Sequence, residues 1–250
     1  MMWEEAVGAT PQGLGPDDFE NWLWNNETPK GLARPTSLSS QSHFSGFADL
    51  PSNNGVGTSG SSKKRHWCFL GEIVEDSLFH PLLLDTKDIH GEKVELHFYT
   101  KDKGLDFMPN HSQKRHTIVV FDATKYTFKF GPPGIRLEDP RKIQIFPLSL
   151  ARTLALNDLV RRLSTRQHSN TRTCHGCGKD APASSMKRCS MCLSFWYCNK
   201  ECQTAGWTKK GHKIDCGYLR HPDLRGLFFT NWDEVQDPVR FPLQVADDFC

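Results

Sequence analysis

The chain has 250 residues, 37% of them hydrophobic, and a formal net charge of +2 at pH 7. Its mean hydropathy of −0.55 predicts that part of the chain lies outside a compact core, although the length allows one or two domains. The near-neutral charge excludes a strong global attraction to nucleic acid, and no apolar run reaches the roughly 20 residues of a membrane helix. We therefore expect a soluble intracellular protein, nuclear or cytoplasmic, in a reducing compartment where clustered cysteines bind metal.

Residues 1–64 have the composition of a disordered tail. From position 29 to position 62 they are rich in Ser, Gly, Asn and Pro and show no regular apolar period. The exception is the run 17–24, Asp-Asp-Phe-Glu-Asn-Trp-Leu-Trp, which sets aromatic residues among acids. Such a run is suited to fold on a partner protein, and docking on its own domain is the other interpretation. The basic run 63–65 is too short to indicate a nuclear signal.

Residues 65–165 have the pattern of a small β-rich domain. Short apolar or alternating stretches predict strands at 66–74, 94–98, 117–121, 126–130, 135–137 and 143–145. The intervals between them are too short for the crossover helices that parallel strands require. We therefore predict a mostly antiparallel curled sheet or small β-barrel. Cys68 is expected to be a small buried hydrophobic residue of this domain.

One helix is predicted at the end of the β-rich domain, over residues 150–163. Leu156, Leu159, Val160 and Leu163 form a single apolar stripe at i, i+3, i+4 and i+7. Ser149 has the position of its N-cap. The predicted fold class is therefore mostly β, with one helix.

Two further segments are defined by composition. Residues 164–173 are polar and basic, as expected of a linker. Residues 217–250 are dense in apolar and aromatic side chains but lack a clean period, which predicts an extended C-terminal tail packed along the folded parts. Cys250 is interpreted as an incidental terminal thiol.

Seven of the nine cysteines lie within residues 174–216, and His212 stands among them four residues before Cys216. These eight side chains are Cys174, Cys177, Cys189, Cys192, Cys198, Cys202, His212 and Cys216. They form two C-x2-C pairs, whose turns bring two sulfurs onto one ion, and two pairs that a helix places one turn apart. Eight such ligands are enough for two tetrahedral zinc ions. The alternative, a disulfide-linked secreted module, lacks a signal peptide and an even cysteine count.

The same run resembles a MYND-type zinc finger at every ligand position. In that family the ligand pairs interleave, whereas the spacing alone leaves sequential pairing open. The resemblance implies one zinc on Cys174, Cys177, Cys198 and Cys202, and the second on Cys189, Cys192, His212 and Cys216. Protein side chains then fill all four positions of each ion, so both zincs are expected to be structural. A segment this short needs them in order to fold.

The resemblance implies a protein-interaction function, because fingers of this family dock proline-containing peptides and recruit regulators. The expected role is an adaptor or regulatory protein in transcription regulation. A helix beginning near residue 199 places Gln203 and Trp207 on one face, and by resemblance both match the family's peptide groove. Ser190 and Met191 are candidates for its other wall. The flanking cations, which favour acidic peptides, are Lys187, Arg188, Lys200, Lys209 and Lys210.

Two alternatives remain open. The first is nucleic-acid binding by an OB-like β-domain with a purely structural finger, since residues 99–103, 114–116 and 125–129 interleave basic and aromatic side chains. The second is a divergent methyltransferase, because MYND fingers also interrupt the SET domain of one lysine-methyltransferase family. The SET motifs and every other catalytic motif sought are missing from the sequence. We therefore predict that the chain is not an enzyme.

Overall fold

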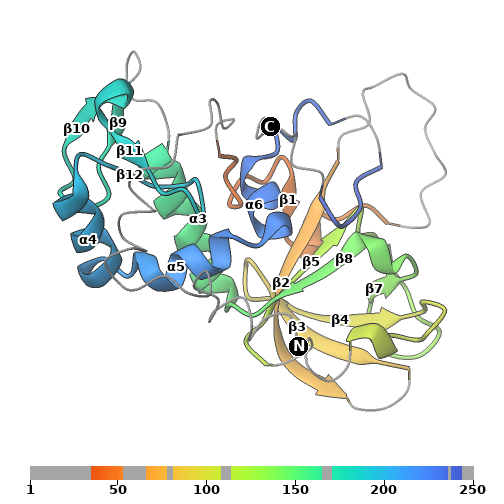
Figure 1. Cartoon of the computed structure of the whole chain (residues 1–250). Helices are drawn as coiled ribbons and strands as arrows, with labels where there is room; N and C mark the ends of the chain where they lie inside the picture. The colour runs from red at the N-terminus through yellow and green to blue at the C-terminus, as the bar shows by residue number, and fades with distance from the viewer. Residues whose placement is uncertain are drawn as a thin grey trace. The chain divides into compact units, whose positions relative to one another are not determined.

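The computed structural model describes residues 35–52, 66–77, 81–107, 114–164, 171–235 and 238–243 (Figure 1). The chain divides into two compact units. We call Leu38–Ala155 together with Trp232–Leu243 the barrel unit, and the unit that contains Leu156–Asn231 the finger unit. Within the described ranges, every helix is too short or too polar to traverse a lipid bilayer.

One sheet forms the barrel unit. Its strands are β1 (Phe44–Ser45), β2 (Cys68–Ser77), β3 (Leu83–Asp88), β4 (Lys93–Phe98), β5 (Thr117–Phe121), β6 (Lys125–Tyr126), β7 (Gly134–Leu137) and β8 (Ile143–Phe146). They follow the order β6-β7-β4-β3-β2-β5-β8, and β1 pairs with β2. The sheet is mostly antiparallel, as predicted, but the β1–β2 and β4–β7 pairs are parallel.

Two consecutive strands bring the ends of this sheet together. β7 pairs with β4, whereas β8 pairs with β5 at the far end of the strand order. Between them lies the single 3-10 turn η3 (Pro140–Lys142). One short stretch of chain, residues 134–146, thus contributes strands near both ends of the curled sheet. The predicted fold class is confirmed.

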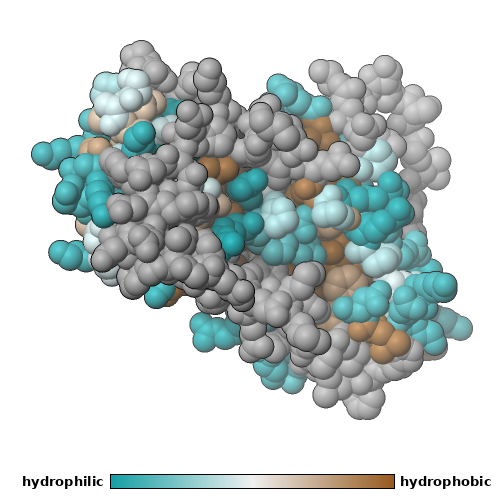
Figure 2. All heavy atoms as spheres, viewed as in Figure 1, coloured by the Kyte–Doolittle hydropathy of each residue, from teal (hydrophilic) through white to brown (hydrophobic). Residues whose placement is uncertain are grey.

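The core of the barrel unit lies inside the curl. Inward side chains alternate along β3 and β4, where Leu84, Leu96 and Phe98 are buried. The other buried residues of this cluster are Phe47, Leu50, Phe69, Ile73, Leu82, Val94, Ile118, Val120, Ala123, Ile135, Leu137, Ile143 and Ile145. On the face shown in Figure 2, hydrophilic side chains cover most of the described surface. The apolar groups of the alternating strands are therefore on the inside.

Helix α3 (Leu150–Ser164) follows the last strand, as predicted. The hydroxyl of Ser149 accepts a hydrogen bond at 3.2 Å from the backbone N–H of Arg152, which is the expected cap. Leu156 is fully buried. In the first turn, the hydroxyl of Thr153 lies 3.0 Å from that of Thr117 in β5, so the helix starts attached to the barrel.

The predicted disorder of residues 1–64 is wrong for residues 35–52. Phe44, Phe47 and Leu50 of this stretch are buried, and the Asp88 carboxylate accepts a hydrogen bond from the backbone N–H of Phe47 at 2.8 Å. These apolar residues stand in a stretch rich in Ser, and their partners lie far along the chain. The run 17–24 and the basic run 63–65 lie outside the described residues.

The predicted extended tail after position 216 is wrong for its first part. Helix α6 (Pro222–Phe229) begins with a proline at its N-terminus and buries Leu224, Leu227 and Phe228, which have the i, i+3, i+4 spacing of a helix. Further on, Trp232 and Phe241 pack against Phe121 of the barrel with ring centroids 5.4 Å and 4.7 Å away. Residues 232–235 and 238–243 therefore belong to the barrel unit, and we call them the C-terminal strap.

Candidate metal centre

Residues 171–219 consist of short elements joined by turns. Two hairpins pair β9 (Thr171–Thr173) with β10 (Asp180–Pro182) and β11 (Lys187–Arg188) with β12 (Trp196–Tyr197). The helices α4 (Lys200–Lys209) and α5 (His212–Leu219) follow. Each C-x2-C pair comes directly after the first strand of a hairpin. Strands of two or three residues bury little surface, so this segment needs another source of stability.

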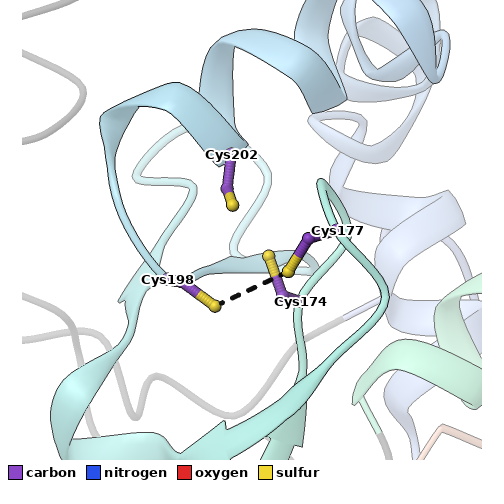
Figure 3. Close-up of side chains that lie close together, drawn as sticks. All are labelled: Cys174, Cys177, Cys198 and Cys202. Atoms are coloured by element: carbon purple, nitrogen blue, oxygen red, sulfur yellow. Dashed lines mark hydrogen bonds between the residues drawn. The ribbon is translucent and has the colours of Figure 1, made fainter.

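The first ligand cluster contains Cys174, Cys177, Cys198 and Cys202, whose sulfur atoms all lie within 4.8 Å of one another. Figure 3 shows that the four sulfurs face a common space, and the sulfurs of Cys177 and Cys198 are 3.9 Å apart. Cys174 is buried, whereas Cys177 is exposed. This cluster is therefore open to solvent on one side.

Local backbone contacts position this first cluster. Asn199 caps α4 by accepting a hydrogen bond from the backbone N–H of Cys202 at 2.9 Å. Gly176 lets the first C-x2-C turn approach the helix, because a Cβ atom there would lie 2.2 Å from the Cys202 carbonyl oxygen. A backbone hydrogen bond from Lys179 lowers the pKa of Cys177 to about 7. Its thiolate, the form that binds metal, is therefore well populated at neutral pH.

The second ligand cluster contains Cys189, Cys192, His212 and Cys216, and all four are buried. The sulfurs of Cys189 and Cys216 are 3.8 Å apart. The sulfur of Cys192 lies 3.3 Å from Nε2 of His212. Helix α5 presents His212 and Cys216 one turn apart, as the spacing predicted.

These distances fit zinc. Around a tetrahedral zinc ion with Zn–S bonds of about 2.3 Å, two sulfurs are about 3.8 Å apart. A sulfur and an imidazole nitrogen on the same ion are slightly closer together. Thiolate and imidazole are also the donors that zinc prefers. The two clusters are thus compatible with two zinc ions, and they interleave along the chain. Four protein donors per ion leave no position for a substrate, which indicates structural metal.

A chain of hydrogen bonds supports the second cluster. With Nε2 of His212 directed at the sulfurs, its Nδ1 carries the proton and donates to the hydroxyl of Tyr197. That hydroxyl donates in turn to Nδ1 of His175, 3.3 Å away. Burial raises the pKa of Tyr197 and lowers that of His175 to about 4, so the phenol stays protonated and the imidazole stays neutral. Ligand spacing gave no sign of this contact, although Tyr197 stands next to a ligand.

Replacing Tyr197 with phenylalanine is expected to weaken metal binding at the second cluster about tenfold and to leave the first unchanged, because removal of a partner that orients a ligand typically costs 10–100-fold. Native mass spectrometry during a chelator titration should show one zinc retained by Tyr197→Phe at concentrations where the parent retains two. Tyr218→Phe, which removes a hydroxyl from α5 itself, is the matched control. Identical release curves for Tyr197→Phe and the parent would contradict the contact.

A buried cation lies beside the second cluster. Arg188 is 5% exposed, its guanidinium lies 5.4 Å from the Trp196 ring centroid, and its Nε donates to the Leu193 carbonyl. Burial lowers its pKa to about 10, while the Cys192 thiolate acts to raise it, so Arg188 stays charged at neutral pH. One zinc with three thiolates and a neutral imidazole has a net charge of −1, which this cation offsets. The expectation that Arg188 flanks a peptide is therefore wrong.

The predicted peptide-binding residues have different environments. Gln203 and Trp207 both lie on α4, but Gln203 is only 8% exposed. The partly exposed Trp207 ring packs edge-on against His212, with centroids 5.3 Å apart. Ser190 and Met191 are half-buried in the second C-x2-C turn.

Two cations of the barrel unit contact other groups of the same unit. The guanidinium of Arg136 lies 4.4 Å from the Tyr99 ring and 5.2 Å from the Tyr126 ring, and its Nε is 2.8 Å from a Glu138 carboxylate oxygen. Lys125 donates its ammonium to a backbone carbonyl. These contacts occupy Arg136 and Lys125, whereas Lys101, Lys103 and Arg115 of the predicted basic runs are exposed.

Comparison with known proteins matches residues 174–216 to the family model described as "MYND finger". A stretch of 55 residues over this segment is 44% identical to part of the protein named ubiquitin carboxyl-terminal hydrolase 19 of Arabidopsis thaliana. That match spans 22% of this chain and 7% of the hydrolase. A MYND finger is generally a protein-interaction module, and the match to the hydrolase leaves most of both chains uncovered.

Proposed function

From the premise that residues 174–216 are a MYND-type zinc finger, we propose that this chain is an adaptor or regulatory protein whose finger docks proline-containing peptides, with a role in transcription regulation. Zinc holds the finger in its binding form. In this proposal the first zinc is bound by Cys174, Cys177, Cys198 and Cys202, and the second by Cys189, Cys192, His212 and Cys216. The finger is thus a binding module rather than a catalytic site.

The observation that supports this proposal most is the attachment of α4 to both ligand clusters. Its first turn carries Cys202 of the first cluster, and Trp207 near its other end packs against His212 of the second. A helix held at both ends keeps its side chains in place before a ligand arrives, so little conformational entropy is lost on binding. The exposed part of the Trp207 ring then offers a flat apolar surface to a proline ring.

Gln203 lies one turn before Trp207, where its amide is suited to hydrogen-bond the backbone of an extended peptide. Its small exposed fraction limits it to a single contact of this kind. Ser190 and Met191 are proposed as the opposite wall. The exposed cations Lys187, Lys209 and Lys210 would increase the association rate of peptides that also carry acids.

Loss of the Gln203 amide is expected to weaken peptide binding about tenfold without loss of zinc, since a backbone hydrogen bond to the peptide disappears. An array of proline-containing peptides, probed with the zinc-loaded chain, would first supply the best binder. Fluorescence anisotropy then compares the affinity of that peptide for the parent and for Gln203→Ala.

Thr204→Ala, at the next and exposed position of α4, is the matched control and should bind like the parent. Trp207→Phe tests the ring while keeping an aromatic group against His212. If Gln203→Ala retains two zincs and full affinity, the assignment of Gln203 is wrong. If the array peptides still bind after every proline is replaced by alanine, the proposal that the finger recognises proline-containing peptides is wrong.

A further inference from the structure

Helix α5 carries an apolar side chain that faces solvent. Ile214 exposes 62% of its surface, and it is the one large hydrophobic residue among the described residues of the finger unit with such exposure. Its helix neighbours His212, Asp215 and Cys216 are buried. The ligand side of α5 thus faces inward, and Ile214 is left as an apolar anchor on the outside.

Three lysines lie close to Ile214 in the sequence, Lys213 on α5 and Lys209 and Lys210 at the C-terminal end of α4. Lys209, Lys210 and Lys213 are exposed, and no carboxylate of the described residues forms an ion pair with them. The nearest acid in sequence, Asp215, is buried. We call these three lysines together with Ile214 the α5 face. Cations beside an apolar anchor select a partner that combines acidic and apolar side chains.

The chain itself contains such a segment. Residues 17–24, Asp-Asp-Phe-Glu-Asn-Trp-Leu-Trp, carry three acids and no base, so their formal charge is −3. Three aromatic side chains and one leucine stand among those acids. This composition complements the α5 face in both charge and hydrophobicity.

The chain between this segment and the finger unit is short. Thr36 is attached to the finger unit, because its backbone N–H donates to the Phe228 carbonyl of α6 at 2.7 Å and its carbonyl accepts from the Asn157 amide at 3.0 Å. Helix α6 packs against α5. Twelve residues lead from position 24 to Thr36, and they span up to about 40 Å when extended, whereas an eight-residue helix is about 12 Å long.

We propose that the α5 face binds the acidic aromatic segment 17–24 of the same chain. The aromatic rings cover Ile214, and the carboxylates pair with the three lysines. The short tether gives the segment an effective concentration in the millimolar range, so modest affinity is enough for occupancy. This contact does not depend on the proline-peptide groove. Its consequence is that an external acidic partner of the α5 face has to displace the segment first.

The test uses the full chain and a fluorescent peptide of residues 15–26. In the variant Trp22→Ala/Trp24→Ala the internal segment no longer competes, so this variant should bind the peptide about tenfold more tightly than the parent. Adding Ile214→Ser or Lys213→Glu to that variant should abolish this increase in affinity for the peptide. Lys187→Glu, a charge reversal at an exposed lysine of β11, is the matched control and should preserve it. Native mass spectrometry verifies two zincs in each variant.

Each other outcome overturns the proposal. Equal affinity of the peptide for the parent and for the double-tryptophan variant would show that the segment does not occupy the face. Binding that survives both Ile214→Ser and Lys213→Glu would place the peptide elsewhere. Concentration-dependent dimerisation of the parent, lost in the double-tryptophan variant, would show that the segment binds a second copy instead of its own chain.

Discussion

Removal of zinc is expected to unfold residues 171–219 and to leave the barrel unit folded. The strands of this segment are only two or three residues long, and structural zinc contributes on the order of 10–16 kcal/mol in finger peptides near neutral pH. No comparable contribution is available from packing in so small a segment. Native mass spectrometry should give two zincs per chain, and after chelation hydrogen exchange should lose protection in α4 and α5 but keep it in β2 and β5.

Single ligand variants separate the two ions. Cys216→Ser is expected to leave one zinc, because the second cluster loses a ligand. Cys68→Ala is the matched control, since Cys68 is a buried cysteine of the barrel outside both clusters, and it should keep two. Persistent protection of α4 and α5 in the metal-free chain would contradict the structural role of zinc.

Phe121→Ala is expected to destabilise the barrel unit by about 3–5 kcal/mol, the usual cost of deleting a buried phenylalanine ring. Phe121 is 1% exposed on β5, and its ring holds both aromatic residues of the C-terminal strap, Trp232 and Phe241. Loss of this ring opens a cavity between the strand and the strap. Thermal unfolding followed by circular dichroism should show the barrel transition at a temperature at least about 10 °C lower.

Phe130→Ala is the matched control for this prediction. Phe130 belongs to the same unit but is 82% exposed, so its truncation should change the free energy of unfolding by no more than about 0.5 kcal/mol. Equal melting temperatures for the two variants would show that the strap does not stabilise the barrel.

Local patterns in the sequence were sufficient for several parts of this structure. The alternation of Val94, Leu96 and Phe98 predicted β4, and the apolar stripe with its cap at Ser149 predicted α3. The C-x2-C pairs and the helical spacing of His212 and Cys216 predicted eight zinc ligands. In each case the information lies within a few residues, because side-chain direction follows the period of the backbone and turn geometry sets which donors reach one ion.

Other parts depend on residues far apart in the chain, and only the tertiary structure decided them. Segments far apart in the sequence meet in the burial of Phe44 and Phe47, in the parallel pairing of β4 with β7 and in the packing of Trp232 on Phe121. No local period of the sequence predicts these contacts. The same holds for the buried charge of Arg188 and for the contact between Tyr197 and His212. A side chain's neighbours across the core determine its solvation and hydrogen bonding, and these neighbours are brought together only when the chain folds.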